Sequence, residues 1–156
     1  MTKLESKVVD SWAMVAWIQQ EVAAPSVRRF LNEADAGNIQ LIMSAINVGE
    51  TFHILAKRSS LALAEAFLNR LPSLPIHVVV PDEEGIMAAA RIKAAHAVAY
   101  GDSFALALAQ AEHASVITGD DEIRKCGLVP VDWVGWPVFA LLAESATPRC
   151  WVQSKA

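Results

Sequence analysis

Short runs of β-branched and aliphatic residues alternate along the chain with longer segments of helical periodicity. We expect the apolar runs to be buried strands, at residues 8–9, 39–43, 76–80, 115–118 and 129–134. We expect the other segments to be helices, at residues 11–21, 25–37, 44–58, 59–71, 82–99 and 102–114. Strands separated by helices form parallel sheets with helices packed on both faces. The pattern therefore predicts an α/β fold, a three-layer α/β/α sandwich with a mostly parallel central sheet.

Local signals support several of these helix boundaries. Pro25 suits the first turn of a helix, and Gly37 suits its C-terminal end. Ser44 is a favoured N-cap residue. The run of acids that begins at Asp82 suits the positive end of a helix dipole. These residues place helix ends where the apolar pattern changes.

The length and composition of the chain fit one folded domain. Its 156 residues are 54% hydrophobic and 19% charged, which suits a packed core and is too apolar for a disordered chain. No apolar run reaches the roughly 18 residues of a membrane span, and no signal-peptide core follows the charged N-terminus. Cys126 and Cys150 form no CxxC pair, so we expect reduced thiols. We expect a cytoplasmic protein with no membrane attachment.

Four acidic residues lie at the ends of predicted elements or on an apolar helix face. Asp10 follows the first strand, Asp120 follows the fourth strand, and Asp102 opens the apolar helix before it. Glu50 lies one helical turn from an isoleucine on either side, which places its carboxylate on a largely apolar stripe. Ligands of parallel sheets bind beyond the carboxyl ends of the strands. These acids are therefore candidate site residues.

Each acid also has a structural explanation when it is taken alone. Asp10 or Ser11 can cap the helix that follows the first strand. Asp102 can be an N-cap, Asp120 a turn residue and Glu50 a buried acid satisfied within the fold. Four converging carboxylates would repel one another unless they shared divalent cations, and Mg²⁺ or Mn²⁺ prefers such oxygen ligands. The joint arrangement indicates metal-assisted phosphodiester hydrolysis.

The net charge argues against a broad electrostatic surface for nucleic acid. The chain has 17 acidic and 13 basic side chains, which gives a net charge of −4. If bound metal neutralised four of the acids, the other acids would balance the bases. Local binding of a phosphate backbone is therefore compatible with the acidic composition.

Four segments of the chain occur in an informative order. They are VVDSWAMVAWIQQE, INVGETFHIL, YGDSFALALAQ and VITGDDEI. In this order they resemble the signature segments of PIN-domain ribonucleases, in particular of VapC-type toxins of toxin-antitoxin pairs, over about residues 7–134. The resemblance implies an endoribonuclease of three-layer α/β/α fold with Mg²⁺ or Mn²⁺ as cofactor. It also implies an acidic quartet that binds the metal, namely Asp10, Glu50, Asp102 and Asp120.

Supporting residues and partners are implied by the same resemblance. Ser11 and Thr118 are implied as polar supports, and Asn47 fits the segment that precedes the family's glutamate. We expect an RNA substrate, a homodimer and a small antitoxin protein that blocks the acidic pocket. Asp121 directly follows Asp120, so either could be the ligand. We expect Asp120 to face the metal, because Asp121 can point to solvent at a turn or a helix start.

The predicted domain organisation has two parts. Residues 1–134 form the PIN-like nuclease domain, and residues 135–156 form a C-terminal extension that packs on the same domain. The apolar segment WPVFALLA is compatible with a cap on the core, a dimer contact or a branch of the family outside the toxins. The five tryptophans are interpreted as core or interface residues rather than as base-stacking platforms.

Other functions are compared on the same residues. A stand-alone PIN nuclease and a catalytically silent PIN-like binding scaffold remain alternatives, although all four acids are present. A Mg²⁺-binding receiver-like regulatory domain would need adjacent acids after the first strand and a lysine that ends a late strand, and the sequence has neither. A phosphatase with a nucleophilic Asp10 would need an acid two residues later, where Trp12 stands. Motifs of dinucleotide-binding, P-loop, zinc-protease and serine-hydrolase proteins are absent from the sequence.

Overall fold

Five parallel strands form the central sheet of the structure, a computed structural model that describes residues 3–136. The strands are β1 (Glu5–Val9), β2 (Ile39–Ser44), β3 (Ile76–Val79), β4 (Ser115–Thr118) and β5 (Val131–Trp133). Their order across the sheet is β3-β2-β1-β4-β5, and each pairing is parallel. The predicted α/β class and the parallel sheet are confirmed.

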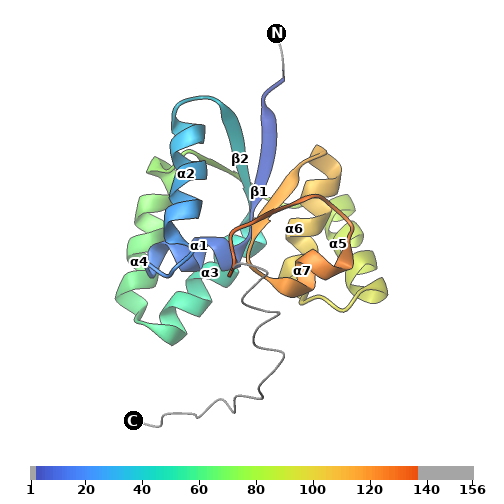
Figure 1. Cartoon of the computed structure of the whole chain (residues 1–156). Helices are drawn as coiled ribbons and strands as arrows, with labels where there is room; N and C mark the ends of the chain where they lie inside the picture. The colour runs from blue at the N-terminus through green and yellow to red at the C-terminus, as the bar shows by residue number, and fades with distance from the viewer. Residues whose placement is uncertain (1–2, 137–156) are drawn as a thin grey trace, which may run out of the picture.

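Helices cover both faces of this sheet (Figure 1). The first face carries α1 (Ser11–Ile18), α2 (Ala24–Asp35), α3 (Ala45–Arg58) and α4 (Leu61–Arg70). A short 3-10 turn, η1 (Leu71–Ser73), follows α4. The second face carries α5 (Glu83–Ala95), α6 (Tyr100–Glu112) and α7 (Asp121–Cys126). The three layers confirm the predicted α/β/α sandwich.

Alternation of side chains along the central strands divides the core in two. Val8 of β1 and Val116 of β4 belong to the cluster that packs with α5, α6 and α7. Val9 and Ile117, the next residues in the same strands, belong to the cluster on the other face. Neighbouring residues of a strand point to opposite faces, so a strand that is covered on both sides needs apolar residues at consecutive positions. This is why short continuous apolar runs predict the strands correctly.

The chain reverses its direction across the sheet at β1. Strands β2 and β3 are added on one side of β1, and β4 and β5 are added on the other side. Such a reversal creates a crevice at the carboxyl ends of the strands where the two directions start. Asp10 directly follows β1, and Asp120 lies two residues beyond the end of β4. The order of the strands therefore brings two of the candidate acids to the same crevice.

Two predicted helix starts are confirmed by hydrogen bonds. Ser44 is the N-cap of α3, and its hydroxyl oxygen accepts a hydrogen bond from the backbone N–H of Ile46 at 3.3 Å. Asp82 is the N-cap of α5, and its carboxylate accepts a hydrogen bond from the backbone N–H of Gly85 at 2.8 Å. Each cap satisfies a backbone donor that the first helical turn leaves free.

Other predicted boundaries differ from the structure. The helix predicted to open at Asp102 begins at Tyr100 with Ala99 as its N-cap, so the N-cap interpretation of Asp102 is wrong. The helix predicted over residues 11–21 ends at Ile18, because Gln20 adopts a left-handed backbone conformation with φ of 56°. The helix α7 was not predicted, since its six residues are too few to show an apolar period.

The C-terminal extension is described only as far as Trp136, so the predicted packing of residues 135–156 lies almost entirely outside the described residues. Among residues 3–136, no helix combines the length and the apolar composition that crossing a membrane requires.

Candidate functional site

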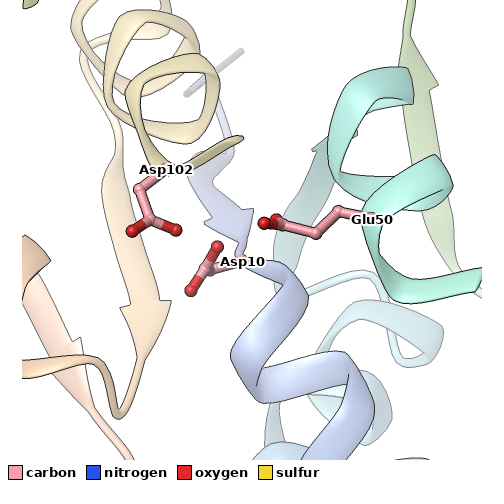
Figure 2. A group of neighbouring side chains, drawn as sticks. All are labelled: Asp10, Glu50 and Asp102. Carbon is pink, nitrogen blue, oxygen red and sulfur yellow. The ribbon is translucent and has the colours of Figure 1, made fainter. Parts of the chain in front are cut away.

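Three carboxylates meet at the carboxyl end of β1 (Figure 2). Asp10 lies between β1 and α1, Glu50 projects from the middle of α3, and Asp102 lies in the first turn of α6. The side chains point toward one another from these three elements, and one carboxylate oxygen of each lies within 4.8 Å of the others. Acids that are 40 and 52 positions apart in the sequence are thus gathered into one cluster.

The Asp10 carboxylate is held by hydrogen bonds to both of its oxygens. The Thr118 hydroxyl donates to Oδ2 at 2.9 Å, and the backbone N–H of Ser11 donates to Oδ1 at 2.8 Å. The second bond makes Asp10 the N-cap of α1, so the capping interpretation is correct for this residue. The side chain is nevertheless wholly buried and faces two other acids. Capping and membership of the acidic cluster are therefore compatible.

The Glu50 carboxylate is positioned by neighbouring polar groups. The Ser11 hydroxyl donates to Oε2 at 2.5 Å, and the Asn47 side-chain amide donates to the same oxygen at 3.3 Å. The Asn47 amide also donates to the backbone carbonyl of Gly101 at 2.9 Å. A Cβ atom at position 101 would lie 2.6 Å from Oε1 of Glu50, so only glycine leaves room for this carboxylate. The predicted supports Ser11 and Asn47 both contact the cluster.

The environment predicted for Glu50 differs from the structure. The sequence places this residue on an apolar stripe with Ile46 and Ile54, which implies burial. Ile46 is 40% exposed, and Glu50 and Ile54 are half-buried at the wall of a cleft. The helix α3 packs partly against α6 rather than wholly on the sheet, so its residues near the cleft stay open to solvent.

Asp102 also belongs to a second group of acids. Carboxylate oxygens of Asp102, Asp120 and Glu122 lie within 4.8 Å of one another. Asp120 is the N-cap of α7, where its carboxylate accepts a hydrogen bond from the backbone N–H of Glu122 at 2.7 Å. The Thr118 hydroxyl, which donates to Asp10, also accepts a hydrogen bond from the backbone N–H of Asp120 at 3.0 Å. Thr118 therefore connects the two groups.

Glu122 was missed by the sequence analysis. It belongs to the VITGDDEI segment, and a helix start at Asp121 would have placed it in the first turn, close to Asp120. The signal was present, but it depended on recognising the short helix α7.

Asp121 has different partners from Asp120. Its carboxylate forms ion pairs with Arg124 and Lys125 of the same short helix. Hydrogen bonds from these two cations lower the pKa of the Asp121 carboxyl below its usual range. Asp121 is thus neutralised within α7, whereas Asp120 contributes to the acidic group.

The buried acids resist ionisation. Burial, together with repulsion from Glu50 and Asp120, raises the pKa of Asp10 to about 7, although the hydrogen bond from Thr118 lowers it. Burial, together with repulsion from Asp10, raises the pKa of Asp102 to about 8. A cation placed among the carboxylates would reverse both effects.

The residues present fit a hard divalent cation. The donors are carboxylate oxygens gathered within 4.8 Å of one another, which is the ligand type that Mg²⁺ and Mn²⁺ prefer. Among the described residues, Oδ1 of Asn47 is buried without a hydrogen-bond partner, while the amide nitrogen of the same side chain donates to Glu50. Asp10, Glu50 and Asp102 would hold the cation, and Asp120 and Glu122 lie on its Asp102 side.

An open cleft leads to the carboxylates. Its walls combine the acids with an aromatic, an aliphatic and a basic side chain, and they include Trp12, Val15, Glu21, Ile54 and Arg58. The cleft is therefore acidic at its base and amphipathic along its walls, which suits a ligand that carries both charge and apolar surface.

The chain belongs to the PIN domain family, because the family model described as "PIN domain" matches residues 7–127. This match covers both acidic groups, β1 from residue 7 onward, and the whole of β2, β3 and β4. A search of curated protein sequences finds no match to the chain.

Solved structures with the same fold include toxins and toxin-antitoxin complexes. VapC20 of Mycobacterium tuberculosis, a sarcin-ricin loop cleaving toxin, is 17% identical with a TM-score of 0.66, and the alignment covers 80% of this chain and 98% of that one. VapBC2 of Rickettsia felis, bound to a fragment of promoter DNA, is 14% identical with a TM-score of 0.64. The alignment covers 85% of this chain and 99% of that one. VapBC-1 of nontypeable Haemophilus influenzae is 15% identical with a TM-score of 0.60, and the alignment covers 83% of this chain and 98% of that one. At these identities the likeness establishes the fold.

The raised pKa values predict that the metal-free protein loses stability as pH rises. Asp10 and Asp102 ionise near pH 3.8 when unfolded but near pH 7 and 8 when folded. The folded state therefore binds more protons between these values, and the free energy of unfolding falls from about pH 4 to about pH 8. Urea unfolding in EDTA at a series of pH values measures this decline, and saturating Mn²⁺ should remove it.

The matched variants for this experiment are Asp102→Asn and Asp121→Asn. Asp102→Asn should flatten the decline between pH 5 and pH 8, because its amide does not titrate. Asp121→Asn should leave the decline unchanged, because Asp121 is already paired with cations at these pH values. A metal-free protein whose stability is constant from pH 5 to pH 8 would contradict the interpretation.

The contact between Gly101 and Glu50 predicts that Gly101→Ala weakens metal binding with little loss of stability. The new Cβ atom displaces a flexible carboxylate rather than the backbone. Changing a group that positions a metal ligand typically costs about 10- to 100-fold in metal affinity. Titration calorimetry with Mn²⁺ measures the change.

Gly49→Ala is the control for this variant. Gly49 also lies in a helix, and a Cβ atom there meets no atom within 4 Å. The substitution should stabilise the helix by about 1 kcal/mol and leave the Mn²⁺ affinity unchanged. Equal affinities in the two alanine variants would show that Gly101 does not position Glu50.

Proposed function

We propose that the protein is a divalent-metal-dependent endoribonuclease and the toxin of a toxin-antitoxin pair. The observation that carries this proposal is the convergence of Asp10, Glu50 and Asp102 in a PIN domain, at the end of β1, where the strand order reverses. Two of these acids, Asp10 and Asp102, are buried, and ionised buried acids destabilise a protein unless a cation compensates. Glu50 and Asp102 line an open cleft beside Asp10, which favours a reaction centre over a structural metal site.

The residues of the cleft have separate tasks in the proposed reaction. A divalent cation would supply a water of lowered pKa and would stabilise the charge that develops on the phosphodiester. Thr118 and Ser11 hold the Asp10 carboxylate in place through its two oxygens. Ser11 and Asn47 orient Glu50. We infer that Asp120 completes the acidic quartet, with its carboxylate held at the N-terminus of α7.

RNA with unpaired bases is the substrate that the cleft supports best. The acidic chain has a net charge of −4, which disfavours the broad basic surface that duplex DNA requires. Arg58 lies on the wall of the cleft, where its charge can meet a substrate phosphate. Unpaired loops can place a single phosphodiester in a compact cleft. The description of the VapC20 toxin as one that cleaves the sarcin-ricin loop supports the same substrate class.

The proposed partners are a second copy of the chain and a small antitoxin. Solved structures with this fold include a toxin-antitoxin complex from Klebsiella pneumoniae, and VapBC and FitAB structures that are bound to DNA. An antitoxin could block the cleft by inserting a basic side chain among the acids, because such a charge replaces the cation electrostatically.

The partner proposal predicts a small DNA-binding protein encoded beside this gene. Expressed together, the two proteins should co-purify, and light scattering of the toxin alone should give the mass of a homodimer. RNA cleavage should be lost in the complex and recovered when the small protein is removed. A monomer with no such neighbouring gene would instead favour a stand-alone PIN nuclease.

Cleavage assays test the nuclease proposal itself. Purified protein with Mg²⁺ or Mn²⁺ should cleave members of a panel of tRNA, rRNA fragments and messenger RNA. Asp10→Asn should lower cleavage to background and still fold, because the amide keeps the size and most hydrogen-bonding capacity of the carboxylate. Asp120→Asn should behave in the same way.

Asp121→Asn is the matched control, since Asp121 neighbours Asp120 but pairs with cations of its own helix. It should retain activity. Loss of activity only in Asp121→Asn would reverse the assignment of the fourth acid. A folded, metal-loaded protein that leaves the whole panel intact would favour a PIN-like scaffold that binds partners without cleavage.

A further inference from the structure

Trp12 lies at the border between the acidic cleft and a second cleft. It belongs to the first turn of α1, two residues after Asp10, and its half-buried side chain lines both clefts. The second cleft is mostly apolar, and its lining includes Val22, Ala23, Ser26, Val134 and Trp136. Glu21 is shared by the two clefts as well. A ligand that occupies the acidic cleft can therefore extend directly over Trp12.

Gly119 lets the Trp12 ring lie close to the backbone, and Gly135 does the same for Trp133. A Cβ atom at Gly119 would lie 2.3 Å from Cη2 of Trp12, so the indole rests directly on this glycine. A Cβ atom at Gly135 would lie 2.5 Å from Cζ2 of Trp133 and 3.0 Å from the Cα atom of Gly119. The two glycines thus lie close together, with Trp12 against Gly119 and Trp133 against Gly135. Position 119 directly precedes Asp120, which ties the location of the ring to the acidic group.

The second tryptophan of this layer is itself held from two directions. The indole N–H of Trp133 donates a hydrogen bond to the backbone carbonyl of Trp136 at 2.9 Å. The Arg124 guanidinium lies 5.1 Å from the centre of the Trp133 ring, and Arg124 is paired with Asp121. The backbone that the Trp12 ring contacts at Gly119 therefore lies beside an ordered tryptophan. A preordered aromatic surface loses little side-chain entropy when a flat ligand stacks on it.

We propose that the second cleft is a nucleobase subsite in which one unpaired base of the RNA stacks on Trp12 while an adjacent phosphodiester lies at the carboxylates. This proposal rests on the proposed nuclease function, and it changes the interpretation of Trp12 from a core or interface residue to a substrate-binding residue. Stacking on an aromatic side chain tolerates any base, because every base has a π-face. The apolar lining suits the flat surface of the base, and Glu21 can accept a hydrogen bond from its edge.

Continuity between the clefts favours a base as the occupant. The phosphodiester and the base are joined in one nucleotide chain, and Trp12 contacts the space for both. A phosphate alone would not explain an apolar cleft, and an apolar peptide would not explain its connection to the acidic one. The described residues that line the second cleft include no basic side chain, so the contribution of this cleft to RNA affinity should not depend on salt.

The test is RNA binding by the full-length Asp10→Asn protein, which should bind without cleaving. The probe is a fluorescently labelled single-stranded RNA that the parent protein cleaves, with one abasic nucleotide moved along its length. One abasic position next to the cleavage site should weaken binding by about 5- to 150-fold, the range expected for one stacked base. Adding Trp12→Leu should weaken binding of the intact RNA by a similar factor and remove the effect of that abasic position.

Two further variants separate stacking from folding. Trp12→Phe keeps an aromatic face and should restore most of the affinity, while the salt dependence of binding stays that of the parent. Trp17→Leu is the matched control, because Trp17 lies in the same helix, is also half-buried and lines a different cleft beside α4. It should leave the abasic profile unchanged. If Trp12→Leu fails to fold, the abasic scan of the Asp10→Asn protein and of its Trp12→Phe form still decides the question.

Two results would overturn the subsite, and they are distinguishable from failure of the nuclease proposal. Cleavage of RNA together with a flat abasic profile would show that the cleft takes another occupant, such as the chain that follows Trp136. Weaker binding by Trp12→Leu that leaves the loss at the same abasic position unchanged would show a structural role for the indole. Absence of both RNA binding and cleavage in the parent protein would overturn the nuclease proposal along with the subsite.

Discussion

The burial of the Asp10 carboxylate is the constraint on which the rest of the site depends. Asp10 has no exposed surface, and hydrogen bonds from Thr118 and Ser11 do not offset its loss of hydration, since its pKa stays raised to about 7. Burying such a group costs several kcal/mol unless a cation or enough donors compensate. The neighbouring acids add repulsion. The arrangement is therefore unfavourable for folding alone, and it becomes favourable when a cation is shared.

Glycine directly precedes an acid in both halves of the site. Gly101 lies before Asp102 and leaves room for the carboxylate of Glu50, while Gly119 lies before Asp120 and leaves room for an indole ring. In each case a side chain from another element contacts the backbone of the glycine that precedes the acid. The two Gly-Asp pairs therefore act as contact points between elements, although in the sequence alone such pairs are typical of turns.

The sequence predicts the layers and most of the acidic cluster because both follow from simple rules. Continuous apolar runs mark strands that are covered on both faces, and acids after those strands meet at one edge. The start of α6 could not be predicted, because Ala99 offers no capping side chain and Gly101 is a poor helix former. Contacts of Gly101 with Glu50 and Asn47 explain why a glycine stands at this position. Glu122 was missed for a related reason, since α7 has too few residues to show a period.

The amide of Asn47 joins the two helical layers directly. It donates to Glu50 of its own helix and to the carbonyl of Gly101, which belongs to α6 on the other face of the sheet. A cation bound by Glu50 and Asp102 would span the same two layers. It would act as a noncovalent cross-link between the halves of the molecule, so that opening either half would first require release of the ion. Metal concentration would then govern how often the protein opens locally, as well as whether it can act on a substrate.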